Sequence, residues 1–446
     1  MVRYAEGDEN LLKYLASIAN DFKCAIGLVL GQVTAQRYNL IHLAKTPPFQ
    51  TSDPQNEEKT IQNLTTVTDI NEGWIADHAR QTTRMLPGGM YVLGIFIVSD
   101  EELLTPFNSK LKSLLNGINK TLQAQSYLFG NGDNEKLIIQ YSPKNLKCLA
   151  KTYDVDTFNV QPVELKLSQK GVKLVGFECL YQIDHVYHLK EEDSRGPLRK
   201  HIKVILEDIN KHLETAIILF DNDLKDPDEK IENMSKKKKV PRGSSNKIDN
   251  HDDCSKPIPV AIFKKCKNPE NYTSLEPLSI SGQIHIIGEI SLRLWLNAKA
   301  SFGDAIVAVK EDLMRSLSTR MEMHWDSLTE EELGEEINSV HEPPRRVLIT
   351  LPESNVTISD YLFPGEGPED VKASLEELLD IKADSQLELL DLEGQADIAQ
   401  YYGSQVPCVQ SKITSTDSSK FMYLLGLGVA FLMLIVSIIV HFYMTD

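Results

Sequence analysis

The sequence has few of the residue patterns that catalytic and metal sites require. It contains no GxxxxGK[ST] phosphate-binding loop, no HExxH motif and no CxxC pair. Its six cysteines follow no regular spacing, so we expect free thiols rather than a disulfide framework. No apolar stretch with a cleavage site follows the first residues, so we expect no secretory signal peptide. We therefore expect no catalytic group, no cofactor and no bound metal.

Positive charge is also scarce. The chain has 47 Lys and Arg residues against 64 Asp and Glu residues, a formal net charge of −17. Such a chain repels the phosphates of nucleic acids, so we expect no nucleic-acid partner. One basic run, residues 236–239, lies in a polar stretch, and we interpret it as a solvated loop rather than a nuclear localisation signal.

One long apolar segment lies near the C-terminal end. Residues 421–440 carry no ionisable side chain, and a helix of that length spans about 30 Å, the thickness of a bilayer's hydrocarbon core. A buried core helix is the alternative, but it would have to be apolar on every face. We predict a single transmembrane helix at residues 420–443, with these anchor residues: Phe421, Leu424, Gly426, Gly428, Phe431, Leu434, Ile438, Val440 and Tyr443.

The flanks of this segment predict its orientation. Lys412 and Lys420 precede it and no Lys or Arg follows it, so the positive-inside bias places the preceding residues in the cytosol. We predict a tail-anchored, single-pass protein of the endoplasmic reticulum membrane with its N-terminal bulk in the cytosol. The outer mitochondrial membrane is the alternative destination.

The first part of the chain alternates strand and helix patterns, which predicts an α/β domain at residues 1–155. Apolar runs predict a hairpin at residues 24–33 and 38–44, a central strand at 90–98 and two strands at 137–142 and 146–153. Helical spacing predicts a helix that ends at Pro87, and Ser99 with Glu102 indicates a capping box that begins another. Residues 50–71 are predicted to form a polar loop.

The rest of the chain divides by composition. We expect a strand and helix extension at residues 156–220, with the helix at 200–220, and a disordered basic and polar insertion at 221–257. A second, strand-rich α+β domain is predicted at residues 258–380. It includes a long strand stretch at 278–296, a helix at 304–325, a strand pair and a helix at 368–379. Residues 381–419, acidic and then rich in Ser and Thr, are predicted to be a tether.

Isolated histidines and cysteines offer only weak candidates for chemistry. His78 has Asp77 beside it, but it lies on the apolar face of its predicted helix, which favours a core histidine over a catalytic one. His185 and His188 would point to opposite faces of a strand, so they cannot chelate one metal. Cys24 opens a buried strand, where a thiol stays protonated.

Several blocks of sequence together resemble a known family. They are GLVLGQV from Gly27, TPP from Thr46, and HARQTTRMLPGGMYVLGIFIV from His78 to Val98. With the lone C-terminal apolar segment, they resemble the odorant-response-abnormal protein 4 family. The positions that carry the family motif are Gly27, Gly31, His78, Arg84, Leu86, Pro87, Gly88, Gly89 and Gly94.

The resemblance implies a non-enzymatic factor of the endoplasmic reticulum. Such a factor promotes the folding, export and ciliary localisation of odorant receptors and other G-protein-coupled receptors, and so supports olfaction. It also implies a protein partner, the protease specific for the ubiquitin-fold modifier, which the family holds at the membrane.

The first domain also resembles the MPN fold of metal-dependent deubiquitinating enzymes. Aligning Gly94 with the glycine of that family's zinc motif puts Ile97 and Ser99 where two histidines would bind the metal. Ile cannot ligate zinc and Ser is a poor substitute for imidazole, so we expect an MPN-like scaffold without zinc ligands. The alternative is a membrane-tethered hydrolase or deconjugating enzyme with a non-standard site.

Overall fold

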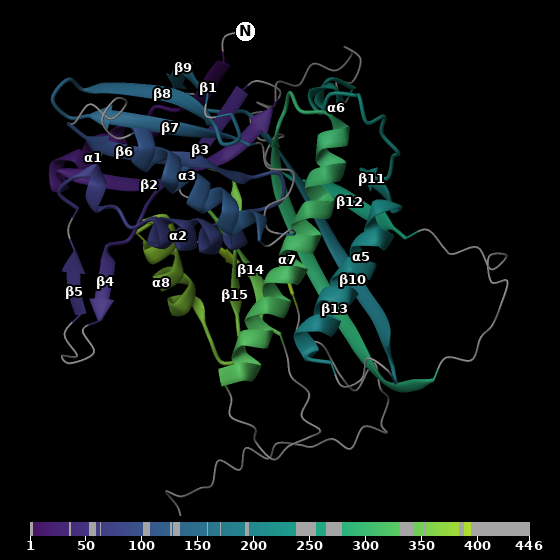
Figure 1. Ribbon diagram of the computed structural model, residues 1–446. Helices are drawn as coiled ribbons and strands as arrows, with labels where there is room; N and C mark the ends of the chain where they lie inside the picture. Colours follow the sequence, from purple (N-terminus) through teal and green to yellow (C-terminus); the bar gives the residue numbers. More distant parts are fainter. Residues whose placement is uncertain are drawn as a thin grey trace, which may run out of the picture. The chain divides into compact units, whose positions relative to one another are not determined.

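The computed structural model describes residues 3–34, 37–52, 59–62, 64–100, 108–124, 127, 134–157, 159–169, 171–191, 196–237, 256–264, 279–330, 343–351, 354–382 and 388–393. These residues belong to one compact unit, residues 1–394, and form a mixed α/β fold (Figure 1). The predicted anchor at 420–443 lies outside the described residues. Within them, no helix combines the length and the apolarity needed to cross a bilayer.

The first part of the chain forms a closed seven-stranded barrel. In spatial order its strands are β1 (Arg3–Asp8), β3 (Arg37–Lys45), β2 (Cys24–Thr34), β6 (Tyr91–Ser99), β7 (Glu135–Ser142), β8 (Lys147–Asp154) and β9 (Val160–Ser168). The predicted hairpin and central strand are confirmed as β2, β3 and β6. β1 pairs in parallel with both β3 and β9, which closes the barrel. The barrel thus continues through β9, beyond the limit expected at residue 155.

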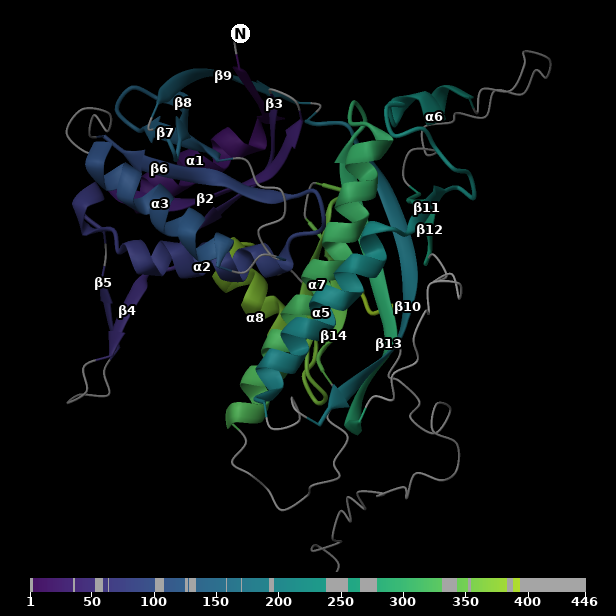
Figure 2. The ribbon, with the colours of Figure 1, turned by 45° about the vertical axis from the view of Figure 1, so that its right-hand side comes forward.

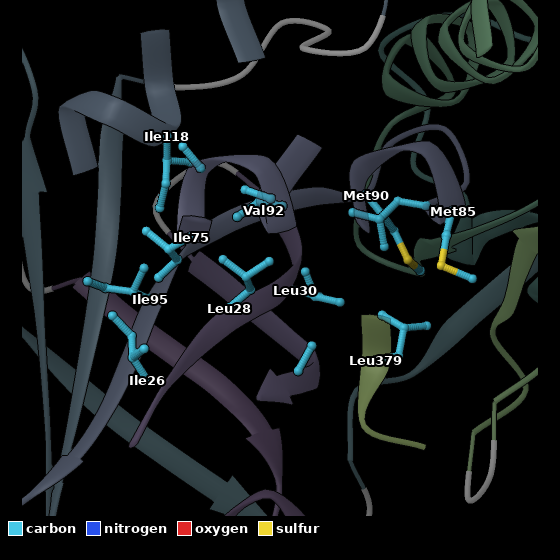
Figure 3. Close-up of a cluster of buried hydrophobic side chains, with 14 of the residues drawn as sticks. Ile26, Leu28, Leu30, Ile75, Met85, Met90, Val92, Ile95, Ile118 and Leu379 are labelled. Carbon is cyan, nitrogen blue, oxygen red and sulfur yellow. The ribbon is translucent and has the colours of Figure 1, made fainter. Parts of the chain in front are cut away.

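Helices cover the barrel strands on two faces. α1 (Asn10–Asp21) packs Leu15 and Ile18 against one face, and α2 (Glu72–Met85) and α3 (Asn108–Gln123) cover the other. Figure 3 shows Ile75 of α2 and Ile118 of α3 directed toward Ile26 and Leu28 of β2. Ser99 is the last residue of β6, so it does not begin the next helix at that point, and Glu102 lies outside the described residues.

The prediction of a polar loop at residues 50–71 is wrong. β4 (Phe49–Ser52) pairs with β5 (Lys59–Gln62), and the short helix η1 (Val67–Asp69) follows with Val67 fully buried. Backbone groups hold this hairpin, so polar side chains do not prevent it. Hydrophobic periodicity, which guided the prediction, gives no signal for such strands.

A four-stranded sheet with the order β11–β12–β10–β13 follows the barrel. β10 (Leu174–Lys190) and β13 (Ile280–Asn297) form a long antiparallel ribbon, flanked by β12 (Ile258–Phe263) and β11 (Ile217–Phe220). Helices α5 (Leu198–Glu214) and α7 (Phe302–Glu330) run along one face of this sheet, as Figures 1 and 2 show. The helix predicted at 200–220 therefore ends early, because its last residues form strand β11.

Part of the predicted disordered insertion is folded. Within residues 221–237, Ile231 is buried and its backbone N–H donates to the carbonyl of Ala300. The short helix α6 (Glu232–Lys237) follows. Composition does not predict this fold, because one isoleucine among charged residues does not outweigh a polar composition. Residues 238–255 lie outside the described residues.

A third, three-stranded sheet has the order β15–β14–β16. β14 (Arg345–Thr350) and β15 (Thr357–Leu362) confirm the predicted strand pair, and α8 (Pro368–Leu379) confirms the predicted helix. Leu379 joins the barrel's core and lies near Met85 and Met90 in Figure 3. The start of the predicted tether is folded instead: β16 (Leu389–Leu390) pairs with β14, and Glu393 is buried. We call residues 388–393 the strap.

Candidate functional site

The two positions expected to replace zinc ligands are buried in β6. Ile97 is fully buried and pairs across the sheet with Ile26, and Ser99 pairs with Cys24. Gly94 has a φ of +159°, and a Cβ there would lie 1.8 Å from the carbonyl oxygen of Leu137 on β7. The glycine is therefore required by the close approach of two strands. Among the described residues, no group of three or more His, Cys, Asp or Glu side chains could hold a metal.

Leu86 to Gly89, which belong to the block that resembles the family, form the turn between α2 and β6. Side chains of helix α7 hold this turn by hydrogen bonds. The Gly88 N–H donates to Asp312 Oδ1 at 2.8 Å. Nη1 of Arg315 donates to the carbonyl oxygens of Leu86 and Pro87 at 2.9 Å each and of Met90 at 3.2 Å. Both α7 side chains are buried, so these hydrogen bonds form away from water.

The two glycines of this turn are needed for the same contact. A Cβ at Gly88 would lie 2.0 Å from the carbonyl oxygen of Ala308 on α7. At that distance either the turn or α7 would have to move. Gly89 has a φ of +75°, a conformation that other residues rarely adopt. The family turn is therefore a junction between the barrel and α7, which we call the α7 junction.

Asp312 extends the α7 junction to the third sheet. Its two carboxylate oxygens accept from Nη1 and Nη2 of Arg346 on β14 at 2.8 and 2.9 Å. Burial lowers the pKa of Arg346, but Asp312, Tyr361 and Glu393 together raise that pKa above its ordinary value. Arg346 is thus a permanent buried cation that needs its carboxylate partner.

The strap also contacts β14 and α7 through Glu393. Glu393 accepts from the backbone N–H of Ser291 at 2.7 Å and from that of Arg346 at 2.8 Å. It also pairs with the guanidinium of Arg320 on α7. One buried carboxylate therefore joins the ribbon, the third sheet and α7 at the end of the described chain.

His78 and Arg84 of the family motif also make structural contacts. Burial lowers the pKa of His78, so the ring is neutral; Nε2 donates to the carbonyl of Leu378 at 2.8 Å and Nδ1 accepts from Thr46 Oγ1 at 3.1 Å. These bonds agree with a core histidine. Arg84 pairs with Glu322 on α7. Gly27 and Gly31 lie in β2, where a Cβ would collide with backbone oxygens of β3.

The cysteines of the described chain offer no activated nucleophile. Burial raises the pKa of the thiols of Cys148 and Cys179 to about 11, so both are protonated at neutral pH. Cys24 is buried at the start of β2. His185 faces α5, where its Nε2 lies 3.4 Å from Asp208, and His188 is exposed on the opposite face, as the alternation predicted.

A small apolar pocket of about 140 Å³ lies beside the TPP block. Trp74 of α2 donates its indole N–H to the carbonyl of Pro47 at 2.9 Å, and the ring of Phe49 packs edge-on against it. Cys24, Ala25 and Ile26 line the pocket from β2. In the sequence, the two prolines stand out only as part of the TPP block. The aromatic residues that complete the pocket lie at positions where only the fold brings them together.

The residues of the α7 junction lie within a stretch of the chain that matches a known family. The model of the family "Odorant response abnormal 4-like" (ODR4-like) matches residues 27–388. The "Protein odr-4 homolog" of Mus musculus is 26% identical, covering 92% of this chain and 88% of that protein, and the Homo sapiens homologue is 27% identical, covering 84% and 82%. The "Odorant response abnormal protein 4" of Caenorhabditis elegans is 23% identical, covering 70% and 64%.

Among solved structures, UfSP from C. elegans superposes with a TM-score of 0.44 at 10% identity, covering 86% of this chain and 57% of that one. The family match spans most of the sequence and includes the whole turn from Leu86 to Gly89. The chain therefore belongs to the odorant response abnormal 4-like family.

Proposed function

We propose that this chain is a non-enzymatic adaptor of the endoplasmic reticulum membrane that promotes the export and ciliary delivery of odorant and other G-protein-coupled receptors. The observation that carries the proposal is the family match over residues 27–388, together with relatives whose names refer to odorant response. In an odorant response, a membrane adaptor without enzymatic activity can promote the folding and the delivery of the receptor.

The adaptor has two parts in this proposal. The apolar segment at 420–443 anchors the chain in the membrane, and the folded unit binds partners on the cytosolic face. Confinement at a membrane raises the effective concentration of the partners, so moderate affinities are sufficient. The acidic surface implied by the net charge of −17 would keep the folded unit off anionic lipid headgroups.

We further propose that the barrel is an MPN-like scaffold that holds the protease specific for the ubiquitin-fold modifier at the membrane. Ile97 at a predicted ligand position supports a scaffold role, because a fully buried hydrocarbon side chain offers no atom to a metal. The raised pKa values of Cys148 and Cys179 count against a thiol-based hydrolase, the alternative reading.

Deleting residues 421–446 tests the adaptor proposal. In cells that deliver an odorant receptor to cilia, we expect the deleted chain to remain folded but to lose receptor delivery and to release the protease from the membrane fraction. A matched control replaces residues 421–440 with an unrelated tail anchor of the same membrane, which should restore both. Receptor delivery and protease fractionation that survive the deletion would contradict the proposal.

A further inference from the structure

A cavity of about 640 Å³ lies where the barrel meets the end of α8 and the turn between β14 and β15. Its described walls come from β1, α1 and β3, from the connection between β9 and β10 and the start of β10, and from residues of that turn and after α8. A volume in the range of roughly 300–1,000 Å³ between packed parts of a fold is typical of ligand sites. No residue of the family turn at 86–89 lines it, so it is separate from the α7 junction.

The cavity has an apolar part and a polar part. The described residues of the apolar part are Leu11, Leu40, Ile41, Leu43, Val172, Leu174 and Ile381. Tyr14, His42, Asp380 and Asp8 supply much of the polar part, and none of the described residues that line the cavity is a lysine or an arginine. A ligand there would therefore meet hydrocarbon walls and groups that mostly accept hydrogen bonds.

The polar groups beside α8 are held in place. Tyr14 donates its hydroxyl to Asp380 Oδ2 at 2.6 Å, and Lys45 Nζ lies 3.0 Å from Asp380 Oδ1. Asp380 has a φ of +53°, a left-handed conformation that a non-glycine residue keeps only when its surroundings fix it. Lys45 therefore compensates the charge of Asp380, and the pair forms a rigid wall.

His42 adds an acceptor to this wall. Its Nε2 lies 2.8 Å from the carbonyl oxygen of Leu379, which can only accept, so Nε2 carries the proton. Burial lowers the pKa of His42, which keeps the ring neutral and leaves Nδ1 with a free lone pair. The imidazole thus adds no positive charge to the cavity.

Asp8 supplies a carboxylate that pairs with no cation among the described residues. Its Oδ1 accepts from the backbone N–H of Asn10 at 2.7 Å, and within the described residues no Lys, Arg or His forms an ion pair with it. Gly171, with a φ of +57°, brings the backbone so close that a Cβ would lie 3.2 Å from Asp8 Oδ2. Among the described residues, the cavity therefore has one carboxylate without a partner cation, next to an apolar wall.

We propose that this cavity binds a monovalent organic cation, an ammonium or guanidinium group on an apolar stem, with Asp8 as the counter-charge and the leucine and valine side chains around the stem. The same chemistry occurs in free amines and in the lysine and arginine side chains of proteins. The cavity does not include the turn at 86–89, and this proposal does not depend on the proposed adaptor function.

The test uses the full chain in detergent micelles and two probes of nearly equal shape. Butylguanidinium carries the charge and butylurea does not. By isothermal titration calorimetry we expect butylguanidinium to bind at least tenfold more tightly than butylurea. Asp8→Asn should weaken butylguanidinium binding at least fivefold, whereas the control Asp21→Asn, at the exposed end of α1, should leave it unchanged.

A second variant guards against misfolding of the first. Val172→Phe fills the cavity without removing a charge, and it should abolish butylguanidinium binding while the melting temperature without probe stays the same. Equal binding of the two probes, or unchanged binding by both Asp8→Asn and Val172→Phe, would overturn the proposal.

A pentapeptide with a central arginine and its citrulline counterpart separate the two sources of the cation. An arginine peptide that binds at least tenfold more tightly than butylguanidinium would identify a protein side chain as the occupant. A peptide that binds more weakly than butylguanidinium would identify a free amine or guanidine. Either result supports the cation site, provided that the citrulline peptide fails to bind.

Discussion

The barrel and the second half of the chain both contain apolar cores, but they differ in their buried arginines. The strands of the barrel bury aliphatic side chains on both faces, as β6 does from Val92 to Val98. The buried arginines of the described chain, Arg315, Arg320 and Arg346, all belong to α7 and β14. Apolar packing is tolerant of direction, whereas buried charges need particular partners. The comparison suggests that the barrel supplies stability and that the charges fix how the second half docks on it.

The largest expected effect is at Asp312. Asp312→Ala removes the partner of the buried Arg346 and of the Gly88 N–H, so we expect the free energy of unfolding to fall by about 3–5 kcal/mol. The control Glu322→Ala removes a partly exposed pair with Arg84 and should cost about 1 kcal/mol or less. Chemical denaturation of both variants measures the difference. Equal losses would remove the special role of the buried charges.

Gly88→Ala should come next. The added methyl group meets the carbonyl of Ala308, and we expect a loss of about 2–3 kcal/mol from the overpacked α7 junction. Gly73→Ala is the matched control, because its Cβ would meet only the Asn71 side chain at 3.5 Å and alanine favours a helix. Thermal unfolding of the two variants should shift in opposite directions. If Gly88→Ala melts like the unchanged chain, the turn is not tightly packed.

Asp360 on β15 should make stability depend on pH. Burial raises its pKa to about 6 from an ordinary value of 3.8, so the folded state disfavours the charged form. This unfavourable contribution is absent below pH 3.8 and grows as pH rises to about 6. We expect Asp360→Asn to raise the free energy of unfolding by about 1–2 kcal/mol at pH 7 and to change it little at pH 4. Urea unfolding at both pH values gives this difference, and a gain of equal size at pH 4 would show that titration is not its cause.

The smallest effect is expected inside the barrel. Ile97→Val removes one methylene group from the apolar core and should cost about 1 kcal/mol, with no dependence on pH or salt. Chemical denaturation at low and at high salt measures the loss of unfolding free energy for Ile97→Val and for Asp312→Ala. A loss of unfolding free energy in Ile97→Val that depends on salt would contradict the difference between the barrel and the second half of the chain.

Local patterns predicted much of the barrel but little of the docking. The hairpin of β2 and β3, the apolar β6 and helix α8 follow from short-range periodicity and from turn residues such as Pro87. Closure of the barrel by β1 and β9 depends on pairing between residues more than a hundred positions apart, for which composition gives no signal. Strand β4 was missed for a related reason, because backbone pairing rather than side-chain pattern defines it. The apolar residues of β11 were assigned to the helix predicted before them.

The candidate site shows the same limit. The sequence singled out Leu86 to Gly89 as a family block and as a turn, yet its partners Asp312 and Arg315 lie more than two hundred positions later. Glu393 was assigned to a tether because an acidic residue in a polar stretch is usually solvated. Its burial is explained by the positions of Arg320 and of the Ser291 and Arg346 N–H groups.

Hydrogen exchange of the full chain carrying Asp312→Asn, followed residue by residue against the unchanged chain, tests the central comparison most directly. The account predicts that amides of α7, of β14 and of the Gly88 turn lose protection by at least a factor of ten, while amides of β2, β6 and β7 keep theirs. Equal loss of protection in the barrel strands, or unchanged protection in α7, would contradict the account.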